Sequence, residues 1–166
     1  YNAFLYEIMY NNLYERGLIM AQLDNFLIQL FHEGNCLQVY KVFGAHIETV
    51  DKQKGVRFTV YAPNAKSVQV VGDFNQWNGE NHYMEKYTDG GIYTLFIPKM
   101  KQYDTYKYRI ETPNGSLVDR ADPYAFFSEL RPGTASKVFN INGYRWADKR
   151  WLNKRTKNFD RVLNIY

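Results

Sequence analysis

The fold is decided by an alternating stretch in the first half of the chain, Gly55-Val56-Arg57-Phe58-Thr59-Val60-Tyr61-Ala62-Pro63. Successive side chains of a strand point to opposite faces, so Val56, Phe58 and Val60 fall together on one face. The following Pro63-Asn64 is a turn signal that ends the stretch. The pattern therefore predicts a strand with one buried face.

Similar patterns follow at short, irregular intervals. Residues 66–74 alternate through Val68, Val70 and Gly72, and strands are also predicted at residues 92–97 and 106–110, with weaker candidates at Val118 and residues 137–139. Turn signals rich in Gly, Asn and Pro separate these segments, and no long helix comes between them. The sequence therefore predicts a mainly β protein, an immunoglobulin-like antiparallel β-sandwich.

A short helical N-terminal segment is predicted ahead of the sandwich. Within residues 1–34, one apolar stripe at helical spacing is formed by Ile19, Leu23, Phe26, Leu27 and Leu30, and such a stripe must pack on something. Gly34 is expected to end this helix, and Asn35 to cap a short helix that reaches Phe43. We therefore divide the chain into a helical extension (1–44), a β-sandwich (45–143) and a connector (144–166).

Composition excludes several classes of protein. Of the 166 residues, 45% are apolar, which is enough for a core, and 17% are aromatic, which favours strands. No apolar run reaches the roughly 18–20 residues of a membrane helix, and no signal peptide pattern is visible at the start. The single cysteine, Cys36, offers no disulfide framework. A cytoplasmic location with no membrane partner is predicted.

Charge and histidine positions argue against nucleic-acid and metal binding. The net charge of +4 comes from residues 145–161, which carry seven basic and two acidic side chains. A solvated connector explains this segment better than a phosphate-binding patch. His32, His46 and His82 are scattered without metal-ligand spacing, so no metal or other cofactor is predicted. Asp73, Asp89 and Asp122 fall at turns, where carboxylates accept backbone N–H groups.

An ordered set of short motifs resembles a known family. The set runs through Gly44-Ala45-His46, Tyr61-Ala62-Pro63-Asn64-Ala65, Val70-Val71-Gly72-Asp73-Phe74-Asn75-Gln76-Trp77-Asn78-Gly79, Tyr106-Lys107-Tyr108, Asp122-Pro123-Tyr124-Ala125 and Thr134-Ala135-Ser136. It resembles the N-terminal glucan-binding module, of the carbohydrate-binding family 48 type, in bacterial 1,4-α-glucan (glycogen) branching enzymes. The resemblance covers residues 24–166, and residues 162–166 are similar to the entry into the first strand of the catalytic (β/α)8 barrel.

The resemblance implies a parent enzyme of glycogen biosynthesis. Such a retaining glycosyltransferase moves a cut α-1,4-glucan segment to a 6-hydroxyl, using carboxylates at the strand ends of its barrel. None of the barrel's signature segments occurs in this chain, so we assign no catalytic residue and expect the chain alone to be inactive. The implied partners are an α-glucan and the barrel of the same parent.

The resemblance also implies the residues that bind glucan. A planar ring can cover the apolar face of a sugar while nearby donors bind its hydroxyls. Trp77 matches the tryptophan that stacks on glucose in related modules, and Lys107 matches a lysine that donates to sugar hydroxyls. Thr134 and Ser136 fall near further polar contacts. Two alternatives remain: Trp77 as a core or barrel-facing anchor, and Lys107 as an ordinary strand lysine.

Leu117 departs from the related stand-alone glycogen-binding modules. Those modules carry a second tryptophan in the hairpin where this chain has Asn114-Gly115-Ser116-Leu117. A leucine buries area but cannot stack flat, and the lost stacking costs about 1 kcal/mol, a factor of roughly five to ten in affinity. We therefore expect the chain alone to bind glucan weakly.

Other classes of protein share parts of the pattern. A stand-alone glycogen- or starch-binding module would carry the second stacking aromatic, and debranching or trehalose-releasing relatives carry a similar module. The motifs at residues 44–46 and 122–125 favour a branching enzyme among these. An immunoglobulin-like adhesion domain would have the disulfide and signal peptide that this sequence lacks.

Overall fold

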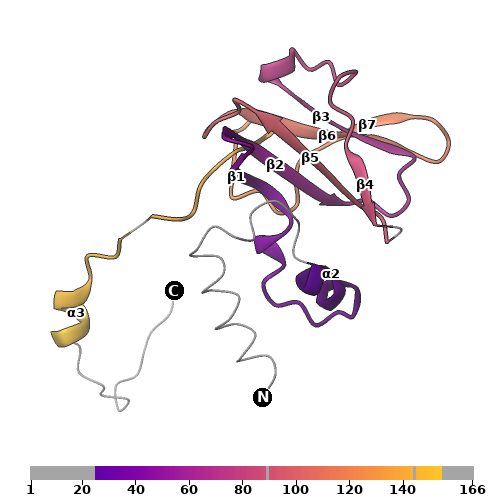
Figure 1. The fold of residues 1–166 in the computed structure, drawn as a ribbon. Helices are drawn as coiled ribbons and strands as arrows, with labels where there is room; N and C mark the ends of the chain where they lie inside the picture. The colour runs from indigo at the N-terminus through magenta and orange to yellow at the C-terminus, as the bar shows by residue number, and fades with distance from the viewer. Residues whose placement is uncertain (1–24, 89, 144, 155–166) are drawn as a thin grey trace.

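The computed structural model describes residues 25–88, 90–143 and 145–154. Two antiparallel sheets pack face to face, helix α2 (Asn25–His32) precedes them, and helix α3 (Lys149–Lys154) follows them (Figure 1). This arrangement confirms the predicted β-sandwich with a short helical segment ahead of it. No helix within the described ranges has the length and apolar content needed to cross a membrane.

The first sheet has the strand order β1-β2-β5-β4. Its strands are β1 (Gly44–Val50), β2 (Gln53–Tyr61), β5 (Ile92–Pro98) and β4 (Glu85–Thr88). Strand β2 contains the alternating stretch that predicted the fold, and it pairs along its length with β1 on one side and with β5 on the other. Strand β4 was not predicted, because an edge strand of four residues is too short to show a period.

The second sheet is built around β6 (Thr105–Glu111). Strand β3 (Ser67–Gly72) pairs along one edge of β6. On the other edge, β9 (Ser136–Lys137) pairs with the first two residues of β6 and β7 (Leu117–Arg120) pairs with the last four. Strand β8 (Phe127–Ser128) pairs with β9 and was not predicted either.

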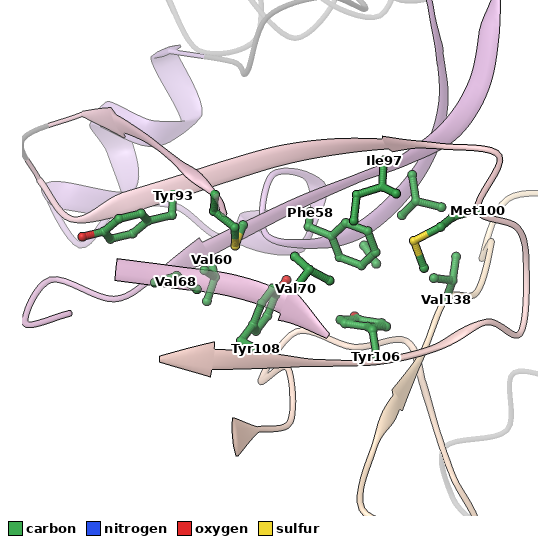
Figure 2. Close-up of a cluster of buried hydrophobic side chains, with 13 residues drawn as sticks. Phe58, Val60, Val68, Val70, Tyr93, Ile97, Met100, Tyr106, Tyr108 and Val138 are labelled. Carbon is green, nitrogen blue, oxygen red and sulfur yellow. The ribbon is translucent and has the colours of Figure 1, made fainter. Parts of the chain in front are cut away.

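Side chains from both sheets meet in one core (Figure 2). The predicted apolar face of β2 is buried there, with Val56 and Phe58 fully inaccessible to solvent. Tyr106 of β6 faces Phe58, and the two ring centroids lie 4.8 Å apart. Each fully buried side chain of this size stabilises the fold by roughly 1.5–3 kcal/mol relative to an exposed one.

The core also contains a buried carboxylate, Asp122. One of its oxygens accepts hydrogen bonds from the hydroxyls of Tyr106 at 2.6 Å and Tyr108 at 3.2 Å, and the other accepts the backbone N–H of Tyr124 at 2.8 Å. Its own backbone N–H donates to the hydroxyl of Ser136 at 2.9 Å. Burial raises the pKa of Asp122, and the four hydrogen bonds of this network satisfy polar groups that would otherwise be left unpaired.

Helix α2 packs on the outer face of the first sheet. Its buried residue is Ile28, which is not one of the predicted stripe and lies in a second apolar cluster with Phe43 and Ile92. Of the predicted stripe, Leu27 packs against this cluster, so the helix has an apolar partner in this chain. Residues 1–24, including Ile19 and Leu23, lie outside the described residues. The short helix expected up to Phe43 is wrong, because only η1 (Val39–Lys41) forms and Leu37 is 95% exposed. Phe43 is instead fully buried against the ring of Tyr124.

The substitution Asp122→Asn tests the buried carboxylate. Because burial raises the pKa of Asp122, its contribution to the free energy of unfolding is fully present below the ordinary Asp pKa and is lost as pH rises through the raised value. Asparagine does not titrate, and its amide group leaves a buried partner unsatisfied at a cost of about 1–3 kcal/mol. Urea denaturation should therefore show a difference between the two proteins that shrinks as pH rises from about 3 to about 7. A difference that does not change with pH would contradict this account.

Candidate functional site

The site lies on the outer face of the second sheet. Tyr106 and Tyr108 of β6 point into the core, so Lys107 and Arg109 point outward. On the neighbouring strand β3, Val71 lies opposite Lys107 and Gln69 lies opposite Arg109. Both of these β3 side chains are buried although they belong to the outer face, which means that another segment covers them.

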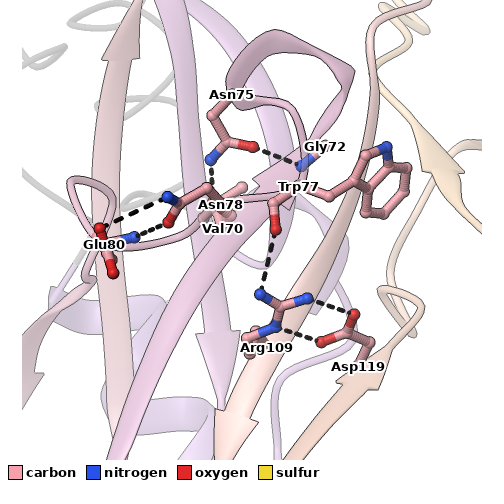
Figure 3. Close-up of polar contacts among 8 residues, drawn as sticks. All are labelled: Val70, Gly72, Asn75, Trp77, Asn78, Glu80, Arg109 and Asp119. Atoms are coloured by element: carbon pink, nitrogen blue, oxygen red, sulfur yellow. Dashed lines mark hydrogen bonds and ion pairs between the residues drawn. The ribbon is translucent and has the colours of Figure 1, made fainter.

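The covering segment is the loop that follows β3, including η2 (Asp73–Asn75). The side chain of Asn75 holds this loop to the end of β3. It accepts a hydrogen bond from the N–H of Gly72 at 2.9 Å and donates one to the carbonyl of Val70 at 3.0 Å (Figure 3). Further along, Gly79 lies so close to Gln69 that any Cβ at this position would collide with the Gln69 side chain. The loop is therefore held down at both of these points.

This loop presents Trp77. Gln76 and Trp77 both adopt the left-handed conformation, with φ of 55° and 62°, which costs roughly 1–2 kcal/mol for each such residue. Hydrogen bonds hold the strained pair: the N–H of Trp77 donates to the carbonyl of Gly72 at 2.9 Å, and its indole Nε1 donates to Asp73 at 3.0 Å. The indole is half-buried and projects from the loop (Figure 3). It is not sealed in the core.

Lys107 connects Trp77 with Thr134. Its Nζ lies 6.0 Å from the centroid of the Trp77 ring and donates to the hydroxyl of Thr134 at 2.7 Å. A cation at this distance is attracted to the ring face, and an ammonium group bound to one acceptor keeps two further donors. The structure therefore brings three of the residues singled out from the sequence into one group, which we call the Trp77–Lys107–Thr134 group.

Arg109 and Asp119 support this group and were missed in the sequence analysis. Arg109 forms a two-point pair with Asp119, with N···O distances of 2.7 and 2.9 Å, and its third nitrogen donates to the carbonyl of Trp77 at 3.1 Å (Figure 3). Hydrogen bonding to Arg109 lowers the pKa of Asp119. The alternation of β6 already places Arg109 on the face of Lys107, but only the register between β6 and β7 brings Asp119 to it.

The structure places Ser136 apart from the group, and the expectation for it needs correction. Ser136 pairs with Tyr106 across β9 and β6, so its side chain points inward; it is 1% exposed and its hydroxyl accepts the N–H of Asp122. Asp73 was expected to accept backbone N–H groups at a turn. Its carboxylate instead accepts hydrogen bonds from the indole N–H of Trp77 and the hydroxyl of Thr105. Asp89 lies outside the described residues.

Leu117 is on the outer face but at the far end of it. It is 60% exposed and lies opposite Glu111, four residues along β6 from Lys107, which corresponds to roughly 13 Å. The Arg109–Asp119 pair lies between them. For metal binding, the described part of the chain contains no cluster of three His, Cys, Asp or Glu side chains that could hold an ion.

The fold and this surface define a class of protein, the immunoglobulin-like sandwiches that present an aromatic ring and hydrogen-bond donors on one open sheet. Residues 42–125 match the family described as carbohydrate-binding module 48 (isoamylase N-terminal domain), and the chain belongs to this family.

Curated relatives with high sequence identity are branching enzymes of Bacillus. The chain is 49% identical over 141 residues to the 1,4-alpha-glucan branching enzyme GlgB of Bacillus cytotoxicus, an alignment that covers 84% of this chain and 22% of the relative. It is 49% identical over 138 residues to GlgB of Bacillus cereus, covering 82% and 21%. The chain therefore spans about a fifth of the length of the curated relatives it matches.

The solved structures that match this chain are much longer chains. One is pullulanase from Bacillus acidopullulyticus, with 23% identity, a TM-score of 0.47 and coverage of 59% of this chain and 12% of the other. Another is Klebsiella pneumoniae pullulanase complexed with maltotriose, with 21% identity, a TM-score of 0.46 and coverage of 63% and 10%.

The substitution Arg109→Met tests how the Trp77 loop is held. It removes the donor to the Trp77 carbonyl and leaves Asp119 without its partner, so the loop should open more often. Losing one such hydrogen bond, worth about 1 kcal/mol, should speed hydrogen exchange of the Trp77 backbone amide roughly fivefold. The matched control is Arg120→Met, because Arg120 is an exposed arginine of β7 on the same sheet. Equal exchange rates in the two variants would count against the support role.

Proposed function

We propose that this chain is the N-terminal, non-catalytic portion of a 1,4-α-glucan branching enzyme and that its sandwich binds and orients α-glucan. The observation that carries the proposal is the Trp77–Lys107–Thr134 group, in which an aromatic ring, an ammonium donor and a hydroxyl meet on one open sheet face. The identity of 49% to branching enzymes over most of this chain supports the same conclusion.

The group suits a sugar because it combines an apolar face with free donors. The Trp77 ring is fixed in place by its bond to Asp73, so little side-chain entropy is lost when a glucose ring stacks on it. Lys107 offers its two remaining N–H donors over one face of the ring, and the Thr134 hydroxyl can donate because it accepts from Lys107. Stacking thus supplies affinity, while the hydroxyl contacts set the orientation of the chain.

The transfer reaction itself belongs to the parent enzyme. In our proposal, residues 45–143 form the glucan-binding module, residues 1–44 are its helical N-terminal extension, and residues 144–166 connect it to a catalytic (β/α)8 barrel on which it packs. The double displacement uses carboxylates of that barrel. The module would raise the local concentration of glucan and aim it at the barrel, in the cytoplasm where the single cysteine stays reduced.

Two alternatives are less well supported. A stand-alone module would need a second stacking ring in the β6–β7 hairpin, where the structure has the exposed Leu117. A debranching relative fits the family description, but the high identity of this chain is to branching enzymes.

The substitution Trp77→Ala should weaken binding of maltoheptaose about tenfold, because it removes the stacking surface and the cation–π partner of Lys107. Isothermal titration calorimetry measures this without depending on tryptophan fluorescence. Trp146→Ala serves as the control, because Trp146 is 74% exposed and follows the last strand of the sandwich. Lys107→Met should weaken binding as well. Unchanged affinity in Trp77→Ala would remove Trp77 from the site.

A further inference from the structure

A second group of aromatic rings is exposed near the β8–β9 edge of the second sheet. Phe127 and Phe139 stack with centroids 5.5 Å apart, and Tyr103 lies 5.9 Å from each of them. Tyr103 is 55% exposed and Phe127 is 44% exposed. We call these three residues the aromatic platform.

The aromatic platform lies on the same sheet face as the Trp77–Lys107–Thr134 group. Strand register places Phe127 opposite Lys137 and Lys137 opposite Thr105, and paired residues of antiparallel strands share a face. Thr105 and Lys107 are two residues apart on β6 and therefore share that face too. Since two strand spacings and two residues separate them, Phe127 and Lys107 lie roughly 12 Å apart at their Cα atoms.

Both aromatic groups are presented by strained backbone. Among the described residues, Trp77 and Tyr103 are the two aromatic residues in the left-handed region, with φ of 62° and 75°. The N–H of Tyr103 donates to the carbonyl of Val138 at 2.8 Å, which holds that turn. Non-glycine residues persist in this conformation only where the surroundings enforce it, and such positions cluster at functional sites.

Polar groups fill the space between the two aromatic groups. The Asp73 carboxylate accepts hydrogen bonds from both the Trp77 indole and the Thr105 hydroxyl, and Lys137 lies in the row between Thr105 and Phe127. The centre of a protein–protein interface is depleted in charged residues, whereas this face has Lys107 and Lys137 between its rings. Rings alternating with donors match a polyhydroxyl chain with apolar ring faces.

We propose that Tyr103, Phe127 and Phe139 form a second stacking surface for the α-glucan chain that binds at Trp77. The proposal rests on the proposed function and extends it from one sugar contact to a longer track across the sheet. It also gives the module a second aromatic contact that the leucine at position 117 cannot provide, on the opposite side of Lys107 from that leucine. The module should therefore prefer long glucan chains to short ones.

The double variant Tyr103→Asn, Phe127→Thr tests this track in the 166-residue chain. Asparagine tolerates the left-handed conformation and threonine suits a strand, so both changes remove rings while keeping the backbone. The affinity for maltoheptaose should fall about five- to tenfold, whereas the affinity for maltotriose should stay unchanged. Tyr40→Ala is the control, because it removes a 41% exposed tyrosine from η1, next to the first sheet.

A positional measurement on the unmodified protein makes the test independent of the variant's folding. Nuclear Overhauser contacts between sugar protons and the rings of Phe127 or Phe139 are expected with maltoheptaose. Wild-type affinity of the double variant for maltoheptaose, or contacts confined to Trp77, would overturn the platform and leave the proposed function standing. Glucan affinity that the double variant keeps in full would instead favour contact of these rings with another protein surface. Absence of any glucan binding by the wild type would overturn both proposals.

Discussion

Strand β6 has one face in the core and the other on the proposed glucan surface, and the buried carboxylate of Asp122 fixes that orientation. The hydroxyls of Tyr106 and Tyr108 both donate to Asp122, so these two residues cannot turn outward without leaving buried polar groups unpaired. A strand has a side-chain period of two, and a slip by one residue would exchange its faces. Lys107 and Arg109 are outward because their neighbours are anchored inward.

The outward face gains its shape from loops that are held in unfavourable backbone conformations. Trp77 is fixed by four polar contacts: its N–H to Gly72, its carbonyl to Arg109, its indole N–H to Asp73, and its ring face to Lys107. Exposed ion pairs such as Arg109–Asp119 contribute little to global stability, typically no more than about 1 kcal/mol. The effect here is local, because Arg109 holds the backbone carbonyl of Trp77 and so fixes the loop that would otherwise lose entropy on binding a sugar. Part of the free energy of folding therefore holds this surface in its binding conformation before a sugar is bound.

The two faces of the sandwich have different partners. Helix α2 covers the outer face of the first sheet around Ile92, in a cluster with Ile28 and Phe43. Among the described residues, the loop that carries Trp77 covers the outer face of the second sheet at Gln69, where Gly79 lies against it. The uncovered remainder of the second sheet includes the aromatic platform and the two lysines. The open face of the second sheet agrees with the proposal that this chain is a non-catalytic part of a larger enzyme.

The sequence by itself determined the sandwich, because alternation in β2, β3, β5 and β6 is a local signal that survives without knowledge of the partners. Through a resemblance carried by short motifs, it also predicted a site of Trp77, Lys107, Thr134, Ser136 and Leu117, of which the structure brings the first three together. It did not reveal that Ser136 points into the core, that Asp119 reaches Arg109, or that Phe127 and Phe139 share the face of Lys107. Those facts depend on strand register between segments far apart in the chain, and register is set only when both sheets close on one core. The short helix expected before Gly44 did not form, because burial of Phe43 against Tyr124, a residue far away in the sequence, outweighs the local helix preference.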